Sequence, residues 1–357
     1  MAELGNQSTS PARRYRILAL DGGGVKGAYS ASVLSTLETL TGKSISQHFD
    51  LITGTSTGGI IAVAVGLGIP LSNILELYVS KGPEIFPSPK RWWLGSVGSL
   101  LRHCLRPKHS QEVLRRAIAD VIGERSFGES QNRLVIPAFN AVSGDIQLFK
   151  TAHTPAYRMD CNRPAIEVAL ATAAAPTYFQ AFTDADGRSF VDGGIWANCP
   201  VMVGIAEAIG VLGWPLDAID VLSIGTTDEP FDISRERRRG GIFRWNRGLV
   251  TLLMSAQVRG TLGFATALTS KRILRIDEIT RPGRFCLDDS REVSELRALG
   301  ENSARRAADD IQRRFLNSPV EPFVAFHPAP ANGNCCEPRS IPVNSSCPTE
   351  TENCGCG

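Results

Sequence analysis

The residues with the clearest chemical potential lie in short glycine-rich segments. Gly54-Thr-Ser56-Thr-Gly58 has the G-x-S-x-G form, in which a serine occupies a tight turn between a strand and a helix. The flanking glycines let the backbone turn sharply, and the helix N-terminus offers unpaired N–H groups and a dipole that favour a developing anion. The pattern predicts a nucleophile at Ser56. It leaves open a structural turn that only packs a helix on a sheet.

A second segment, Asp21 to Gly27 (DGGGVKG), follows an apolar run and has two interpretations. Its first, third and last glycines match G-x-G-x-x-G, which binds a dinucleotide pyrophosphate, whereas its exposed N–H groups could form an oxyanion hole beside Ser56. A dinucleotide site also requires an acidic residue at the end of the second strand. Asp50 lies at the start of that strand, and the serine pattern occupies its end. The arrangement therefore favours acyl transfer.

A serine nucleophile needs a base, and the usual base is a histidine. The chain has five, which are His48, His103, His109, His153 and His327.

In the order Ser, Asp, His of the α/β hydrolases, only His327 could follow an acid at Asp192, and it lies where the chain becomes irregular. The alternative base is Asp192 itself, in Phe190–Gly194 (FVDGG), at the end of an apolar run and beside glycines. A carboxylate becomes a useful base when burial raises its pKa. The competing interpretation of Asp192 is an ordinary turn aspartate.

Apolar runs alternate with helical patterns, which predicts an α/β fold with a mostly parallel sheet and helices on its faces. The expected strands are Tyr15–Leu20, Phe49–Thr53, Leu134–Phe139, Ile146–Phe149, Ser189–Val191, Ile219–Ile224 and Arg272–Ile276. The expected helices are Ala28–Leu40, a helix from Ile60 onward, Gln111–Ile122, Pro164–Ala173, Val201–Leu212 and Arg291–Arg314. We expect a polar, disordered arm over 1–13, one catalytic domain over 14–316 and an irregular, Cys- and Pro-rich tail over 317–357.

Composition narrows the class of protein. Apolar residues make up 43% and charged residues 21% of the 357 residues, with a net charge of +2, so we expect a globular protein without a nucleic-acid partner. The first residues lack a secretory apolar core, and Ile60 to Leu67 is too short to span a bilayer, so a cytoplasmic protein acting peripherally at the inner membrane face is expected. The cysteines match no zinc pattern, and no metal site is expected.

The segments DGGGVKG, GTSTG and DGG, in this order, resemble the motifs of the patatin-like phospholipase family, and Ala171–Phe179 (ATAAAPTYF) is similar to that family's stretch ahead of its aspartate. The resemblance implies a three-layer α/β/α patatin-like fold and a Ser56–Asp192 dyad that needs no histidine and no cofactor. It implies release of fatty acids from membrane phospholipids. It also implies an oxyanion-hole loop formed by Gly22, Gly23, Gly24, Lys26 and Gly27. Lys26 stands where many members of the family carry arginine.

Two basic segments could govern access and regulation. Lys90 to Leu94 (KRWWL) combines indole rings with basic residues, which suits an interfacial segment or lid. The favoured alternative is a helix packed on the body, since tryptophans usually lie in the core. The overall arrangement, and the stretch Arg16–Glu38 (RILALDGGGVKGAYSASVLSTLE) in particular, also resembles the bacterial patatin-like effectors of anti-phage signalling that a cyclic dinucleotide such as cyclic GMP-AMP activates. The second basic segment contains Arg237, Arg238 and Arg239. It has two interpretations, a solvated surface run or a site for a phosphate-bearing effector, because arginine forks bind phosphates.

Three other functions stay open at this point. They are an esterase on acyl substrates outside membranes, an oxidoreductase that uses the GGGVKG loop, and a scaffold without activity. The sequence leaves the oligomeric state open.

Overall fold

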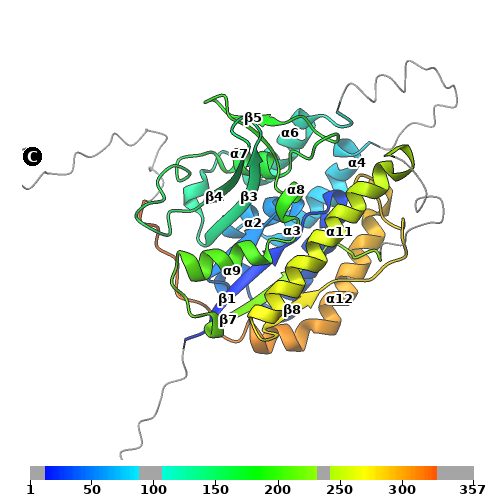
Figure 1. The fold of residues 1–357 in the computed structure, drawn as a ribbon. Helices are drawn as coiled ribbons and strands as arrows, with labels where there is room; N and C mark the ends of the chain where they lie inside the picture. Colours follow the sequence, from blue (N-terminus) through cyan, green and yellow to red (C-terminus); the bar gives the residue numbers. More distant parts are fainter. Residues whose placement is uncertain (1–12, 88–106, 231–241, 328–357) are drawn as a thin grey trace, which may run out of the picture.

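The computed structural model describes residues 13–87, 107–230 and 242–327. These residues form three layers, a central β-sheet covered by helices on both faces (Figure 1). The three-layer α/β/α fold expected from the sequence is thus confirmed.

The sheet has eight strands within the described ranges. They are β1 (Tyr15–Leu20), β2 (Leu51–Gly54), β3 (Arg133–Asn140), β4 (Asp145–Lys150), β5 (Phe182–Thr183), β6 (Ser189–Asp192), β7 (Ile219–Ile224) and β8 (Ile273–Ile276). The order across the sheet is β5-β6-β3-β2-β1-β7-β8, and β4 also pairs with β3. The strands from β3 to β8 in this order are parallel, whereas β4 and β6 run antiparallel to β3 and β5 antiparallel to β6.

The α-helices of the described residues have the following bounds. They are α1 (Gly27–Thr41), α2 (Thr57–Gly66), α3 (Leu71–Glu76), α4 (Gly82–Ile85), α6 (Gln111–Ile122), α7 (Ala165–Thr172), α8 (Gly194–Ala197), α9 (Val201–Gly210), α11 (Ile242–Leu268) and α12 (Val293–Arg314). Short 3₁₀ turns occur at Gly24–Lys26, Ile45–His48, Phe127–Glu129, Leu216–Ala218 and Ser290–Glu292, and one π-helical turn at Leu77–Lys81.

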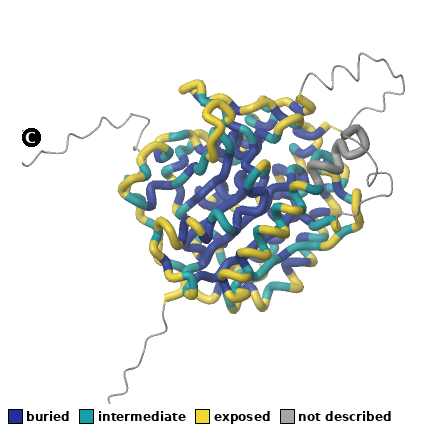
Figure 2. Tube along the Cα trace, in the orientation of Figure 1, coloured by how far each residue is buried: buried dark blue, intermediate teal, exposed yellow. Residues whose placement is uncertain are grey.

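Alternation along the strands divides the core into two clusters. In β1, Leu18 and Leu20 belong to the cluster that includes residues of α1, α2, α3, α6, α7 and α12, while Ile17 and Ala19 belong to the cluster that includes residues of α9 and α11. The reason is that successive side chains of a strand point to opposite faces of the sheet. Figure 2 shows the buried residues running through the middle of the molecule beneath an exposed outer shell.

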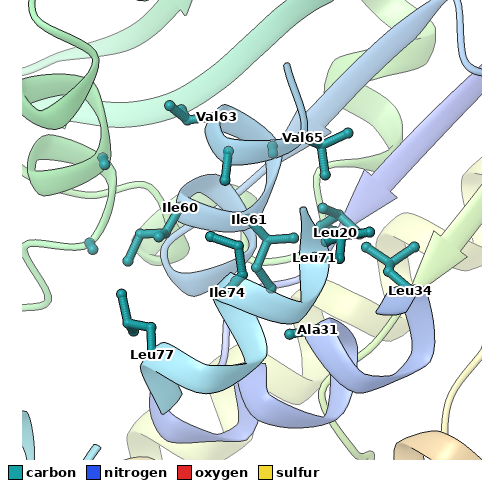
Figure 3. Close-up of a cluster of buried hydrophobic side chains, with 14 of the residues drawn as sticks. Leu20, Ala31, Leu34, Ile60, Ile61, Val63, Val65, Leu71, Ile74 and Leu77 are labelled. Carbon is teal, nitrogen blue, oxygen red and sulfur yellow. The ribbon is translucent and has the colours of Figure 1, made fainter. Parts of the chain in front are cut away.

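The first cluster holds α2 in place. Figure 3 shows Ile61 of α2 among Leu20 of β1, Leu34 of α1 and Ile74 of α3. All ten residues of α2 are buried. A helix that is apolar on every side must be covered on every side. The packing of neighbouring elements around α2 therefore fixes the position of Thr57, its first residue.

Each expected strand is present, and the expected helices agree with the structure to within a few residues at their ends. Several elements were not predicted: the two-residue strand β5, the short helices α3, α4 and α8, and the long helix α11. The α11 sequence carries glycines at 248, 260 and 263 and a basic beginning, so its helical signal is weak. In the described part of the chain, no helix combines the length and apolarity needed to cross a membrane.

Candidate active site

Ser56 lies in a sharp turn between β2 and α2. Its backbone dihedrals are φ 55° and ψ −124°, a region that residues with a side chain rarely adopt. The two neighbouring glycines are sterically required, because a Cβ on Gly58 would overlap the carbonyl oxygen of Leu20 and a Cβ on Gly54 would overlap that of Gly58. The sequence therefore builds a strained elbow that presents Ser56 at the N-terminus of α2.

Asp192 ends β6 and meets Ser56 across 136 residues of sequence. The Ser56 hydroxyl donates to Asp192 Oδ2 over 2.6 Å, and the Gly194 amide donates to Asp192 Oδ1 over 2.6 Å. The sheet brings the two residues together, because only β3 separates β2 from β6, and Ala138 of β3 pairs with Asp192.

Asp192 is buried, and this changes its acidity. Burial raises the pKa of the carboxyl from 3.8 to about 6, against the opposing effect of the hydrogen bonds from Ser56 and Gly194. At pH 7 the carboxylate form still outnumbers the acid by about ten to one. The group is therefore ionised at neutral pH and more basic than an exposed aspartate.

The glycine-rich loop after β1 lies beside the elbow. β1 and β2 are parallel neighbours with Leu20 paired to Gly54, so the segments that follow them emerge at the same edge of the sheet. A Cβ on Gly22 would lie 3.2 Å from the Cβ of Ser56. Gly24 has φ 58°, where glycine is favoured.

The N–H groups of this loop are not equivalent. Gly22 N donates to the Asn198 carbonyl over 3.0 Å, and Lys26 N donates to Gly23 O over 3.1 Å. Within the described ranges, the amides of Gly23 and Gly24 donate to no protein atom. These two amides are the free donors of the loop.

Lys26 and Gly27 serve the loop in other ways. The Lys26 ammonium donates to the Thr227 carbonyl over 3.2 Å, and burial lowers the pKa of this lysine. Gly27 begins α1, and a Cβ there would overlap the hydroxyls of Thr57 and Tyr78. Both residues hold the loop against its neighbours.

Several residues that support the site were not singled out from the sequence. Thr172 accepts a hydrogen bond from Ser56 N over 3.0 Å, and Thr226 donates to Gly22 O over 3.1 Å. Arg275 binds Asp21 at the end of β1, at 2.6 Å. Thr172 lies in the ATAAAPTYF motif, but no local pattern could have identified the partners of these side chains.

None of the histidines that the structure describes is bonded to Ser56 or Asp192. Their ring nitrogens bond Ser44 O (His48, 2.8 Å), Asp288 (His109, 3.0 Å), Glu207 (His153, 2.9 Å) and Pro155 O (His327, 2.9 Å). His103 lies outside the described residues. The arrangement thus supplies a carboxylate, and no described histidine, to the serine.

Other expectations fall outside the described residues. The effector site at Arg237, Arg238 and Arg239 and the segment Lys90 to Leu94 both do so, as do residues 1–12 of the N-terminal arm and 328–357 of the C-terminal tail. Among the side chains that are described, no group of three or more His, Cys, Asp or Glu is placed to hold a metal ion.

Comparison with known proteins finds a family model, curated relatives and solved structures that match this chain. A family model described as "Patatin-like phospholipase" matches residues 18–205. A "cGAMP-activated phospholipase" of Pseudomonas aeruginosa is 34% identical, over 87% of this chain and 92% of the relative. A protein of the same name from Escherichia coli is 32% identical, over 87% of this chain and 95% of the relative. The solved structure of VipD from Legionella pneumophila aligns with a TM-score of 0.39 and 10% identity, over 84% of this chain and 67% of that one.

Proposed function

The chain belongs to the patatin-like phospholipase family, and we propose that it hydrolyses acyl esters of membrane phospholipids with Ser56 as nucleophile and Asp192 as base. The observation that supports this assignment is the 2.6 Å hydrogen bond from the Ser56 hydroxyl to a buried carboxylate. Across this distance the hydroxyl proton can pass directly to the carboxylate, which supports the assignment.

The first half-reaction forms an acyl-enzyme. Asp192 takes the hydroxyl proton of Ser56 as the serine oxygen attacks the ester carbonyl, and the carbonyl π electrons move onto its oxygen. When the tetrahedral intermediate collapses, the bond to the alcohol breaks and the proton on Asp192 passes to the leaving oxygen. The serine is left esterified and Asp192 is again a carboxylate.

The second half-reaction consumes water. Asp192 removes a proton from the water that attacks the acyl-serine, and the proton then returns to the Ser56 oxygen as the fatty acid leaves. One carboxylate therefore serves both steps. A base with a pKa of about 6 suits this double role, because it gains and loses a proton near neutral pH.

The negative oxygen of the intermediate is proposed to rest on the amides of Gly23 and Gly24, aided by the N-terminal dipole of α2. The bonding of the loop favours these two donors, since the Gly22 amide already donates to the Asn198 carbonyl. Loss of one such donor costs on the order of a hundred- to a thousandfold in rate in other serine hydrolases.

Activation by a cyclic dinucleotide and peripheral action at the inner face of the membrane are part of the same proposal. The support is the similarity to two relatives named cGAMP-activated phospholipase, which extends over 87% of this chain in each case. Arg237, Arg238 and Arg239 are the proposed effector contacts, because arginine forks bind phosphates in a bidentate manner. Replacing all three by alanine should abolish activation and leave the fold intact.

The test is fatty-acid release from phosphatidylglycerol vesicles with and without a panel of cyclic dinucleotides, for wild type, Ser56→Ala, Asp192→Asn and His327→Ala. We expect the first two variants to be inactive and His327→Ala to equal wild type. Activity in Ser56→Ala, or its loss in His327→Ala, would exclude the dyad. Turnover of soluble esters alone, with no release from vesicles, would favour an esterase.

The dinucleotide interpretation of the GGGVKG loop fits the structure poorly. Asp50 lies before β2, and its carboxylate accepts a hydrogen bond from Arg16 N over 2.9 Å, so it caps the start of the sheet. The end of β2, where a ribose-binding acid would be needed, carries the serine elbow instead.

A further inference from the structure

We infer that Thr172 is a positioning residue that holds Ser56 and Asp192 in register for acyl transfer. The inference rests on the proposed function of that pair. It concerns the last residue of α7, a side chain with no exposed surface.

The Thr172 hydroxyl connects the serine elbow to the sheet. It accepts the Ser56 N–H over 3.0 Å and donates its own proton to the Pro137 carbonyl of β3 over 2.6 Å. Both roles of the hydroxyl are therefore used, and both partners are backbone groups. Removing the oxygen would leave a backbone amide and a backbone carbonyl without their partner in a buried place.

The backbone around Thr172 holds the base. Gly193 N donates to the Thr172 carbonyl over 3.3 Å, and Asp192 N donates to the Ala174 carbonyl over 3.0 Å. Residues 172–174 are thus hydrogen-bonded both to Ser56 and to the end of β6, which carries Asp192. Because the same three residues contact both, they restrict the motion of Ser56 relative to Asp192.

The elbow needs such a restraint. Ser56 has φ 55°, and a strained backbone conformation persists only where its surroundings fix it. A hydroxyl that binds the Ser56 amide fixes the orientation of the peptide that enters the serine. Without it, the Ser56 side chain is free to leave the 2.6 Å contact with Asp192 Oδ2.

The experiment compares Thr172→Val with Thr172→Ser in the full-length protein. Valine keeps the shape and removes the hydroxyl, whereas serine keeps the hydroxyl. We measure kcat and KM on a soluble 4-nitrophenyl ester, the rate of labelling by a fluorophosphonate and the pH dependence of kcat/KM. Thr151→Val is the matched control, because Thr151 is also buried and its hydroxyl also accepts a backbone N–H, from Leu134 at the start of β3.

We expect Thr172→Val to lower kcat by about a hundredfold with little change in KM, because a misplaced reacting group costs about that much. The acid limb of its pH profile should move to higher pH. The Ser56 hydrogen bond lowers the pKa of Asp192, so losing that bond raises it. Thr172→Ser should restore both properties, and Thr151→Val should change neither.

Two results would overturn the inference. One is a Thr172→Val enzyme with the kcat of wild type. The other is a Thr172→Val enzyme with a lower kcat, an unshifted acid limb in its pH profile, and a fall in melting temperature equal to that of Thr151→Val. That combination would show that Thr172 has a merely structural role. If the valine variant is insoluble, Thr172→Ala against Thr172→Ser isolates the same oxygen, and equal activity of these two would likewise overturn it. Ser56→Ala, run in parallel, tests the proposed function separately.

Discussion

Replacing Asp192 by asparagine should make the protein more stable while removing its activity. The pKa of Asp192 is raised from 3.8 to about 6 in the folded chain, mainly by burial. The difference of about two pKa units corresponds to about 3 kcal/mol by which ionised Asp192 disfavours the folded state. Asparagine has almost the same shape, stays neutral, and keeps an oxygen for the Gly194 amide.

The size of this stabilisation depends on pH. Between pH 4 and pH 6 the folded state binds more protons at this site than the unfolded state, so wild-type stability falls as pH rises through that window. Below pH 4 the carboxyl is neutral in both states and the two proteins should be nearly equal. Above pH 6 the advantage of Asp192→Asn should reach its plateau of about 3 kcal/mol.

The assay is urea unfolding of wild type and Asp192→Asn at pH 4 and pH 8, together with ester hydrolysis. Asp184→Asn provides a control of opposite sign. Burial raises the pKa of Asp184, but its bonds with Arg188 outweigh burial and lower it, so this variant should lose stability at pH 8 and lose less at low pH. The reasoning would be refuted if Asp192→Asn were less stable than wild type at pH 8. It would also be refuted if the difference in unfolding free energy between the two proteins were the same at pH 4 and pH 8.

Further predictions concern the same region. The kcat/KM of wild type should fall on the acid side with a midpoint near pH 6, the pKa of Asp192, and a midpoint near 4 would contradict the role of burial. Gly58→Ala should destabilise the protein by about 1–3 kcal/mol, because the added methyl overlaps the Leu20 carbonyl. Unfolding in urea measures this, and Gly210→Ala, with open space around it, is the control. Arg275→Met should cost about 3–5 kcal/mol, since it leaves the buried Asp21 carboxylate without its cation, and a loss below 1 kcal/mol in the same assay would contradict this.

Local sequence determined the elements of the fold and the nucleophile candidate. The strand, turn and helix around Ser56 are encoded within about twenty residues, because apolar periodicity and glycine spacing act over short distances. The same holds for the loop after β1. The helix α11 was not predicted, because its glycines and basic beginning weaken the local helical signal. Packing against α8 and α9 decides its conformation.

Only the tertiary structure decided how these pieces meet. Asp192 lies 136 residues from Ser56 and Thr172 lies 116 residues from it, and both contacts depend on strand order in the sheet. Which loop amides remain free likewise depends on the distant carbonyl of Asn198. The physical reason is that hydrogen bonding and burial act through space, so the pKa of Asp192 and the restraint on Ser56 exist only once the sheet has formed.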